Sequence, residues 1–178
     1  MSNWALILGA SSGIGASCAK ELAKKGVNIY GVYLRKKSDV IDKLTSELKS
    51  YGVEVIYKKM SATNELKRVE AIEELKKIKN INIKVFVHSL AFGTLKPMIA
   101  NNSEDMLNQK NIEMTLDVMS NSLVYWAQDL FTNNLFSSGS QIFAMTSAGS
   151  HTQWKSYGAV SMAKAALESA IRQLAVEL

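Results

Sequence analysis

A glycine-rich turn between an apolar strand and an amphipathic helix is the feature that most limits what this chain can fold into. Gly9, Gly13 and Gly15 follow the apolar run at residues 4–8, and the next apolar positions recur at helical spacing until Gly26. Glycine adopts backbone angles closed to other residues and lets a phosphate approach the main chain at a helix N-terminus. The segment therefore predicts strand, phosphate-binding turn and helix, with a purely structural turn as the alternative.

Strands and helices continue to alternate along the rest of the chain. Strand patterns cover residues 27–34, 53–57, 83–87 and 141–146, and helical patterns cover residues 40–51, 65–78, 104–135 (one long helix or two consecutive ones) and 156–178. Such a succession indicates βαβ units, and thus a parallel sheet with helices on both faces. We expect an α/β doubly wound parallel sheet, the Rossmann fold, forming a single domain over residues 1–178.

The chain stops inside its last predicted helix, whereas a doubly wound dinucleotide-binding fold usually has a sixth strand. We therefore expect a fold that lacks its C-terminal strands within these residues. The single cysteine, Cys18, lies beside Leu22 on the apolar side of the first predicted helix. It excludes a disulfide framework and is expected to be a core thiol.

Hydropathy and charge argue against a membrane protein, a secreted protein and a nucleic-acid-binding protein. No window approaches the run of about 18 apolar residues typical of a membrane span, and the N-terminus shows no signal-like pattern, so we expect a cytoplasmic protein and no membrane partner. The net charge is +5. No recognition helix or base-stacking motif accompanies it, so a phosphorylated cofactor or an acidic carrier is a better match than nucleic acid.

The residues after the second predicted strand bear on the choice of cofactor. A protein that prefers NAD places a carboxylate there against the ribose hydroxyls, whereas this chain has Arg35, Lys36 and Lys37. Cations pair with the oxygens of a 2′-phosphate. The pattern favours NADPH, and a solvated basic loop is the alternative.

Tyr157 and Lys164 are candidate catalytic residues. Seven residues make about two helical turns, which return to nearly the same face after about 10 Å. A phenol can donate a proton or a hydrogen bond to a carbonyl oxygen, and a nearby ammonium assists the phenol and can hold a ribose diol. The alternative is a surface lysine and a tyrosine near a helix cap.

Together these motifs resemble the short-chain dehydrogenase/reductase family over nearly the whole chain. Most members have the lysine four residues after the tyrosine, where this chain has Ser161. The spacing Tyr-x6-Lys, with the segment His88-Ser-Leu-Ala-Phe92, is similar to the enoyl-acyl-carrier-protein reductase branch. The tight glycine motif resembles the NADPH-dependent type III enzymes of that branch.

The resemblance also implies roles for individual residues. Ordinary members carry an asparagine that anchors a proton-relay water, and that position aligns with Met119. Asn121 lies two residues away, so a shift in the alignment would give the role to Asn121 instead. A hydroxyl near the substrate carbonyl falls to Thr146 or Ser147, with strand-end capping as the alternative. The expected catalytic residues are Tyr157, Lys164, Thr146 and Ser147, and the expected cofactor-binding residues are Gly9, Ser11, Ser12, Gly13, Ile14, Gly15, Arg35, Lys36, Ser61, His88, Ser89, Leu90 and Lys164.

The resemblance implies NADPH-dependent reduction of a 2,3-trans-enoyl thioester in fatty acid synthesis. The substrate would be an acyl thioester, carried by acyl carrier protein or by coenzyme A. The alternatives are a carbonyl reductase, such as a 3-oxoacyl-acyl-carrier-protein reductase, and a non-catalytic NADP-binding protein. Family resemblance also implies a homodimer or homotetramer assembled through residues 104–135 and 156–178.

Overall fold

A computed structural model describes residues 2–178 of the chain. The elements in chain order are β1 (Ser2–Leu8), α1 (Gly13–Lys24), β2 (Asn28–Tyr33), α2 (Ser38–Lys49), β3 (Val55–Lys59), α3 (Glu65–Lys76), β4 (Ile81–His88), the 3₁₀ turn η1 (Ser103–Asp105), α4 (Gln109–Leu116), the π-helix η2 (Asp117–Asn121), α5 (Ser122–Thr132), β5 (Gln141–Ala144), the 3₁₀ turn η3 (Ala148–Ser150) and α6 (Gly158–Glu177).

These elements form two compact units. Unit 1 contains the described residues up to Ser89 together with Ala127–Phe143, and unit 2 contains Leu90–Trp126 and Ala144–Leu178. The chain passes from unit 2 back to unit 1 within α5 and returns to unit 2 at the end of β5.

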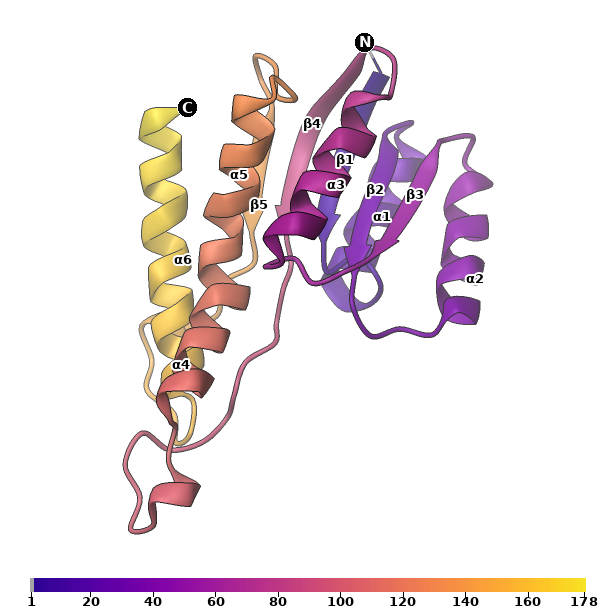
Figure 1. Cartoon of the computed structure of the whole chain (residues 1–178). Helices are drawn as coiled ribbons and strands as arrows, with labels where there is room; N and C mark the ends of the chain where they lie inside the picture. The colour runs from indigo at the N-terminus through magenta and orange to yellow at the C-terminus, as the bar shows by residue number, and fades with distance from the viewer. Residues whose placement is uncertain (1) are drawn as a thin grey trace. The chain divides into compact units, whose positions relative to one another are not determined.

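Unit 1 is built on a five-stranded sheet of order β3-β2-β1-β4-β5. The pairs β1–β2, β1–β4 and β2–β3 are parallel. Helix α3 lies in front of the sheet and α1 behind it (Figure 1). All residues from Trp4 to Leu8 in the central strand have no exposed surface, as expected for a parallel strand that is covered on both faces. The predicted doubly wound α/β fold is confirmed.

Unit 2 is a group of packed helices. Helix α6 packs against α4 and the π-helix, and Met119, Val160 and Ala163 form a buried cluster between them. A capping box starts α4, in which the side chains of Asn108 and Asn111 each accept a hydrogen bond from the other's backbone N–H.

The structure corrects three details of the sequence-based expectations. The helix predicted over 104–135 begins at Gln109 and contains a five-residue π-helix before α5. The fifth strand ends at Ala144, and the next carbonyl, that of Met145, accepts a hydrogen bond from the Lys164 ammonium (2.6 Å). Cys18 is only partly buried, since alanine and glycine residues form the buried face of α1. Across residues 2–178, no helix combines the length and the apolar character that a bilayer crossing requires.

The glycine turn after β1 rests on a close contact that Gly31 makes possible. Tyr57 donates a hydrogen bond from its hydroxyl to the Ala10 carbonyl (3.0 Å). A Cβ on Gly31 would lie 2.6 Å from the Tyr57 ring and 2.9 Å from the Ala10 Cβ. Any larger residue at position 31 must therefore displace the Tyr57 ring, which holds the turn.

We predict that Gly31→Ala lowers the free energy of unfolding by about 1–3 kcal/mol, because the added methyl group overpacks this contact. Urea denaturation measures the loss. Tyr57→Phe is the control, since it removes only one hydrogen bond, worth about 1 kcal/mol. An unchanged denaturation midpoint for Gly31→Ala would contradict the proposed packing.

Candidate active site

The carboxyl ends of the parallel strands bring several predicted cofactor-binding residues of unit 1 to one edge of the sheet. Leu8 pairs in register with both Val32 and His88, and Tyr33 pairs with Lys59. The loops that follow these strands therefore leave the sheet side by side. In open α/β sheets, ligands bind at this edge.

The glycine turn has the backbone geometry of a phosphate-binding loop. Gly9 and Gly13 have φ angles of 84° and 55°, in the region that favours glycine. A Cβ on Gly15 would overlap the Gly9 carbonyl oxygen, so only glycine permits this approach of α1 to the end of β1. Ser12 is the N-cap of α1, and its side chain makes no capping hydrogen bond. These residues fit a pyrophosphate at the N-terminus of α1.

The neighbouring positions of the turn contribute in different ways. Ser11 is partly buried, whereas the Ile14 side chain is 59% exposed and thus lies outside the apolar face of α1. Helical spacing from Cys18 and Leu22 predicts Ile14 on that face, and the structure corrects this, since Gly15, Ala16, Ala19 and Ala23 are the buried residues of α1.

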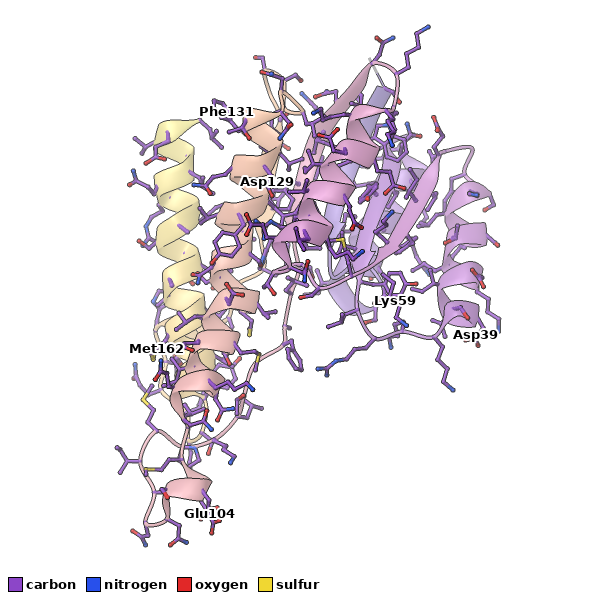
Figure 2. The ribbon with its side chains drawn as sticks, in the orientation of Figure 1. Asp39, Lys59, Glu104, Asp129, Phe131 and Met162 are labelled. Atoms are coloured by element: carbon purple, nitrogen blue, oxygen red, sulfur yellow. The ribbon has the colours of Figure 1, made fainter. Side chains whose placement is uncertain are left out.

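Arg35, Lys36 and Lys37 are exposed in the segment between β2 and α2. Lys59, at the end of β3, adds a cation that sequence reasoning missed (Figure 2). Its pairing with Tyr33 puts it at the same sheet edge as the start of that segment. Lys59 is distant from Arg35 in the sequence, so only the parallel pairing of β2 with β3 shows that the two residues lie at the same edge of the sheet.

The other predicted residues of unit 1 are fixed at the same edge. Ser61 follows β3, and its hydroxyl lies 3.0 Å from that of Thr63. His88 is fully buried, so its imidazole is packed in the interior. The Ser89 backbone N–H donates to the Leu8 carbonyl (2.9 Å), which ties the end of β4 to the end of β1.

Unit 2 brings Tyr157 and Ser147 together. Tyr157 is the N-cap of α6, and its carbonyl accepts the N–H of Ser161 (2.9 Å). Its hydroxyl lies 3.3 Å from the Ser147 hydroxyl. Ser147 Oγ also accepts the N–H of Gly149 (3.1 Å). Since this bond uses a lone pair, the hydroxyl hydrogen of Ser147 stays available for donation.

Lys164 is 4% exposed and lies on the same helix. Its ammonium donates to the carbonyls of Met145 (2.6 Å) and Leu90 (3.4 Å). Burial lowers the pKa of Lys164 to about 8. An ammonium has three hydrogens, so two carbonyls leave one hydrogen for a further acceptor.

The two hydroxyl candidates have different partners. Thr146 Oγ1 donates to Glu168 Oε1 (2.5 Å), whereas Ser147 faces Tyr157. Of this pair, the structure therefore brings only Ser147 to the tyrosine. Thr146 and Ser147 follow the strand instead of closing it.

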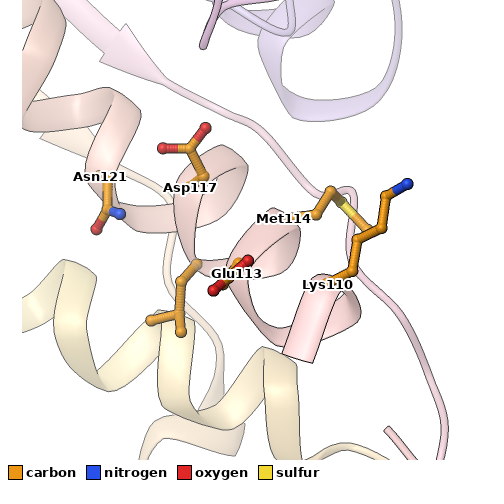
Figure 3. A pocket seen from close by; sticks show the side chains of 6 residues that line it. Lys110, Glu113, Met114, Asp117 and Asn121 are labelled. Carbon is orange, nitrogen blue, oxygen red and sulfur yellow. The ribbon is translucent and has the colours of Figure 1, made fainter. Parts of the chain in front are cut away.

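Met119, and not Asn121, lies next to Tyr157. Met119 is buried against Val160 and Ala163, and Tyr157 packs against the same cluster. Asn121 instead lines an open pocket of about 480 Å³ along α4 and the π-helix, together with Lys110, Glu113, Met114, Leu116 and Asp117 (Figure 3). The structure thus places Met119, and not Asn121, in the cluster that packs against Tyr157.

Apolar groups flank Tyr157 within unit 2. The Trp154 ring meets the Tyr157 ring edge-on, with centroids 5.2 Å apart. The Met98 side chain lies against Gly158, where a Cβ would come 2.9 Å from the Met98 Cγ. Trp154 is 49% and Met98 46% exposed, so neither is ordinary core. The hydroxyl pair thus lies next to apolar side chains that can contact an acyl chain.

Residues 9–178 match the sequence family described as Enoyl-(Acyl carrier protein) reductase. The chain belongs to this family. The family is part of the short-chain dehydrogenase/reductases, a class of NAD(P)-binding oxidoreductases, which confirms that resemblance at the level of the class.

Curated relatives match parts of the chain, among them a dehydrogenase-like protein and a reductase. The Hydroxysteroid dehydrogenase-like protein 1 of Gallus gallus is 36% identical over 105 residues, or 58% of this chain and 31% of that protein. The Very-long-chain 3-oxoacyl-CoA reductase of Coccidioides immitis (strain RS) is 29% identical over 97 residues, or 54% of this chain and 27% of that protein. The matches span 27–31% of the length of these relatives.

Solved structures share the fold of this family member. A short-chain dehydrogenase/reductase from Serratia marcescens superposes with a TM-score of 0.85 at 20% identity, covering 100% of this chain and 69% of that one. An alcohol dehydrogenase from Thermococcus sibiricus, complexed with 5-hydroxy-NADP, superposes with a TM-score of 0.81 at 22% identity, covering 98% of this chain and 71% of that one.

The lowered pKa of Lys164 predicts a pH-dependent contribution to stability. The folded chain releases this proton near pH 8, whereas the unfolded chain keeps it up to about pH 10.5. Between these values the unfolded state binds more protons, so stability rises with pH. Below about pH 8 both states are protonated, and the cost of burying the ammonium is constant.

We predict that the unfolding free energy of the wild type, minus that of Lys164→Met, increases from pH 8 to pH 10 and is flat from pH 6 to pH 7. Denaturant unfolding at a series of pH values measures this difference, and subtracting the variant removes the contribution of other groups. A flat difference above pH 8 would show that Lys164 keeps an ordinary pKa.

Proposed function

We propose that this protein reduces the C2–C3 double bond of a 2,3-trans-enoyl thioester with NADPH. The observation that carries the proposal is the hydroxyl pair of Tyr157 and Ser147 at the start of α6, on the helix that also bears the buried Lys164. Two hydroxyls 3.3 Å apart can both donate to one oxygen that becomes negatively charged.

The glycine turn and the basic segment would hold the cofactor. Gly9, Gly13 and Gly15 suit a pyrophosphate, because they open the backbone at the N-terminus of α1. Arg35 and Lys36 suit a 2′-phosphate. Lys164 would bind the nicotinamide ribose through its remaining N–H, and at pH 7 it is protonated, since its pKa is about 8. When bound, the reduced nicotinamide supplies a hydride to C3 of the substrate.

Residues of the chain would stabilise the negative charge that develops on the substrate during hydride transfer. As C3 gains the hydride, the double-bond electrons move toward the thioester carbonyl, and its oxygen becomes an enolate oxygen. Tyr157 donates a hydrogen bond to that oxygen. Ser147 can donate a second one, because its Oγ accepts from Gly149 and retains its hydrogen. A proton from solvent water then adds at C2 and restores the thioester carbonyl, so that the product has gained one hydride and one proton.

Met119 favours an enoyl substrate over a ketone. Reduction of a ketone requires a proton for the product oxygen, and ordinary family members are expected to relay it from a position that aligns with Met119. Here an apolar side chain, 3% exposed, fills that position against Val160 and Ala163. An enolate takes its proton on carbon, so its reduction does not depend on that relay.

The second candidate is reduction of a 3-oxoacyl thioester. The hydroxyl pair of Tyr157 and Ser147 is compatible with it, because the same two hydroxyls can hold a ketone oxygen directly. The name of the Coccidioides immitis relative, a 3-oxoacyl-CoA reductase, agrees with this candidate. We further propose that acyl carrier protein carries the thioester, that the protein forms a homo-oligomer and that it is located in the cytoplasm. The third candidate function is that of a non-catalytic NADP-binding protein.

We predict NADPH oxidation with crotonyl thioester and little or none with acetoacetyl thioester, followed at 340 nm. Turnover of acetoacetyl thioester alone would replace the proposal with the second candidate. NADPH binding without turnover of either thioester would favour the non-catalytic protein.

In the same assay, Tyr157→Phe should lower kcat about 100-fold or more, because it removes a donor to the enolate oxygen. NADPH binding, measured by nucleotide fluorescence, should stay close to that of the wild type. Retained turnover would exclude Tyr157 as the catalytic donor.

We predict that Arg35→Ser with Lys36→Ser weakens NADPH binding about 100-fold or more and changes NADH binding little, because charged hydrogen bonds to a 2′-phosphate are worth about 1.5–3 kcal/mol each. Lys43→Ser on the exposed side of α2, combined with Lys49→Ser, is a control with the same change in charge. Equal loss of NADPH and NADH affinity would contradict a role in choosing the cofactor.

A further inference from the structure

The carboxylate of Glu168 on α6 lies at the centre of a hydrogen-bonded cluster that the proposed chemistry does not use. Its Oε1 accepts from the hydroxyls of Thr146 (2.5 Å) and Ser150 (2.7 Å). Its Oε2 lies 3.3 Å from His151 Nε2. One side chain thus contacts three positions of the segment between β5 and α6.

We infer that Glu168 is a positioning residue, which holds residues 145–151 against α6 so that the Ser147 hydroxyl meets the Tyr157 hydroxyl. The inference deepens the proposed function and rests on it, since positioning matters only if the pair carries the reaction.

Two successive turns of α6 hold two successive residues of the segment. Lys164 binds the carbonyl of Met145, and Glu168, one turn later, binds the hydroxyl of Thr146. Residues four apart lie on the same face of a helix. The segment is therefore fixed on both sides of the peptide bond that joins these residues, immediately before Ser147.

Hydrogen bonds within the segment carry this constraint to Ser147. The Ser150 N–H donates to the Ser147 carbonyl (3.1 Å), and the Gly149 N–H donates to Ser147 Oγ (3.1 Å). Ser150 Oγ lies within reach of both the Ser147 carbonyl (2.9 Å) and Glu168. Its single hydrogen favours the carboxylate, since charge-assisted bonds are the stronger ones.

The same segment also packs against the Tyr157 ring. A Cβ on Gly149 would overlap that ring, whose Cδ1 would lie at 2.8 Å. The Trp154 ring packs edge-on against Tyr157, and the Tyr157 N–H donates to the Trp154 carbonyl (3.2 Å). A shift of the segment would therefore move both members of the hydroxyl pair.

The hydroxyl contacts, more than the contact with histidine, give Glu168 this role. The Glu168 side chain is 18% exposed, whereas that of His151 is 76% exposed, and exposed ion pairs contribute little. The hydrogen bond from Thr146, followed by the one from Ser150, holds the pKa of Glu168 below its usual value. The carboxylate is thus ionised at neutral pH and can accept both hydroxyl hydrogens.

The test measures kcat and KM with NADPH and crotonyl thioester for variants of the full chain. Glu168→Ala should lower kcat about 10- to 100-fold, because small displacements of catalytic groups have effects of this size. KM for NADPH should change less than twofold. Glu168→Gln keeps one acceptor oxygen and should fall between Glu168→Ala and the wild type. The matched control is Glu177→Gln, an exposed carboxylate at the end of the same helix.

Thr146 provides the conservative comparison. Thr146→Val removes the hydroxyl and should lower kcat, whereas Thr146→Ser keeps it and should restore kcat. If Thr146 acts through Glu168, Thr146→Val adds little to the loss already caused by Glu168→Ala. Fully additive losses, or unchanged kcat in Glu168→Ala, would overturn the inference.

A second readout does not depend on activity. Lys155 is exposed in the segment before Tyr157, and trypsin cleaves after lysine. Loss of the Glu168 contacts should speed cleavage there in Glu168→Ala and leave Glu177→Gln at the wild-type rate. An unchanged cleavage rate would overturn the inference, because the segment would then be held without Glu168. Faster cleavage in a protein without thioester turnover would keep the anchor and reject the proposed function.

Discussion

Burial of β1 on both faces is the constraint on which the rest of unit 1 depends. The five residues Trp4–Leu8 have no exposed surface, so helices must cover both sides of the sheet. Parallel pairing with β2 and β4 then requires each connection to cross over through a helix. Every connection therefore starts from the same edge of the sheet, and the glycine turn and the basic segment after β2 both lie at that edge.

Unit 2 depends on a different constraint, the burial of the charged Lys164 at 4% exposure. Its ammonium donates a hydrogen bond to the carbonyl of Met145, the residue directly after β5. Glu168 accepts a hydrogen bond from the next hydroxyl along the chain, that of Thr146. The segment that carries Ser147 is thus shaped by charged groups on α6, and this shape produces the hydroxyl pair on which the proposed reduction of an enoyl thioester rests.

Much of the fold followed from sequence, because hydrophobic periodicity reports which faces are buried. The strands and helices of unit 1 occur where the pattern predicted them, within a few residues. The π-helix at Asp117–Asn121 was not predicted, since helical periodicity does not reveal one extra residue in a turn. Cys18 was expected in the core, but the small residues of α1 form its buried face instead.

For the candidate site, the sequence by itself determined the residue types and their spacing: a glycine turn after the first strand, a basic segment after the second, and Tyr157 two turns before Lys164. These are local, and a helix or a turn sets their geometry. Only the tertiary structure decided that Ser147 meets Tyr157, that Thr146 instead meets Glu168, and that Met119 is the residue packed beside the tyrosine. Those contacts join residues up to 38 positions apart, and side-chain packing, which no local pattern encodes, selects among them.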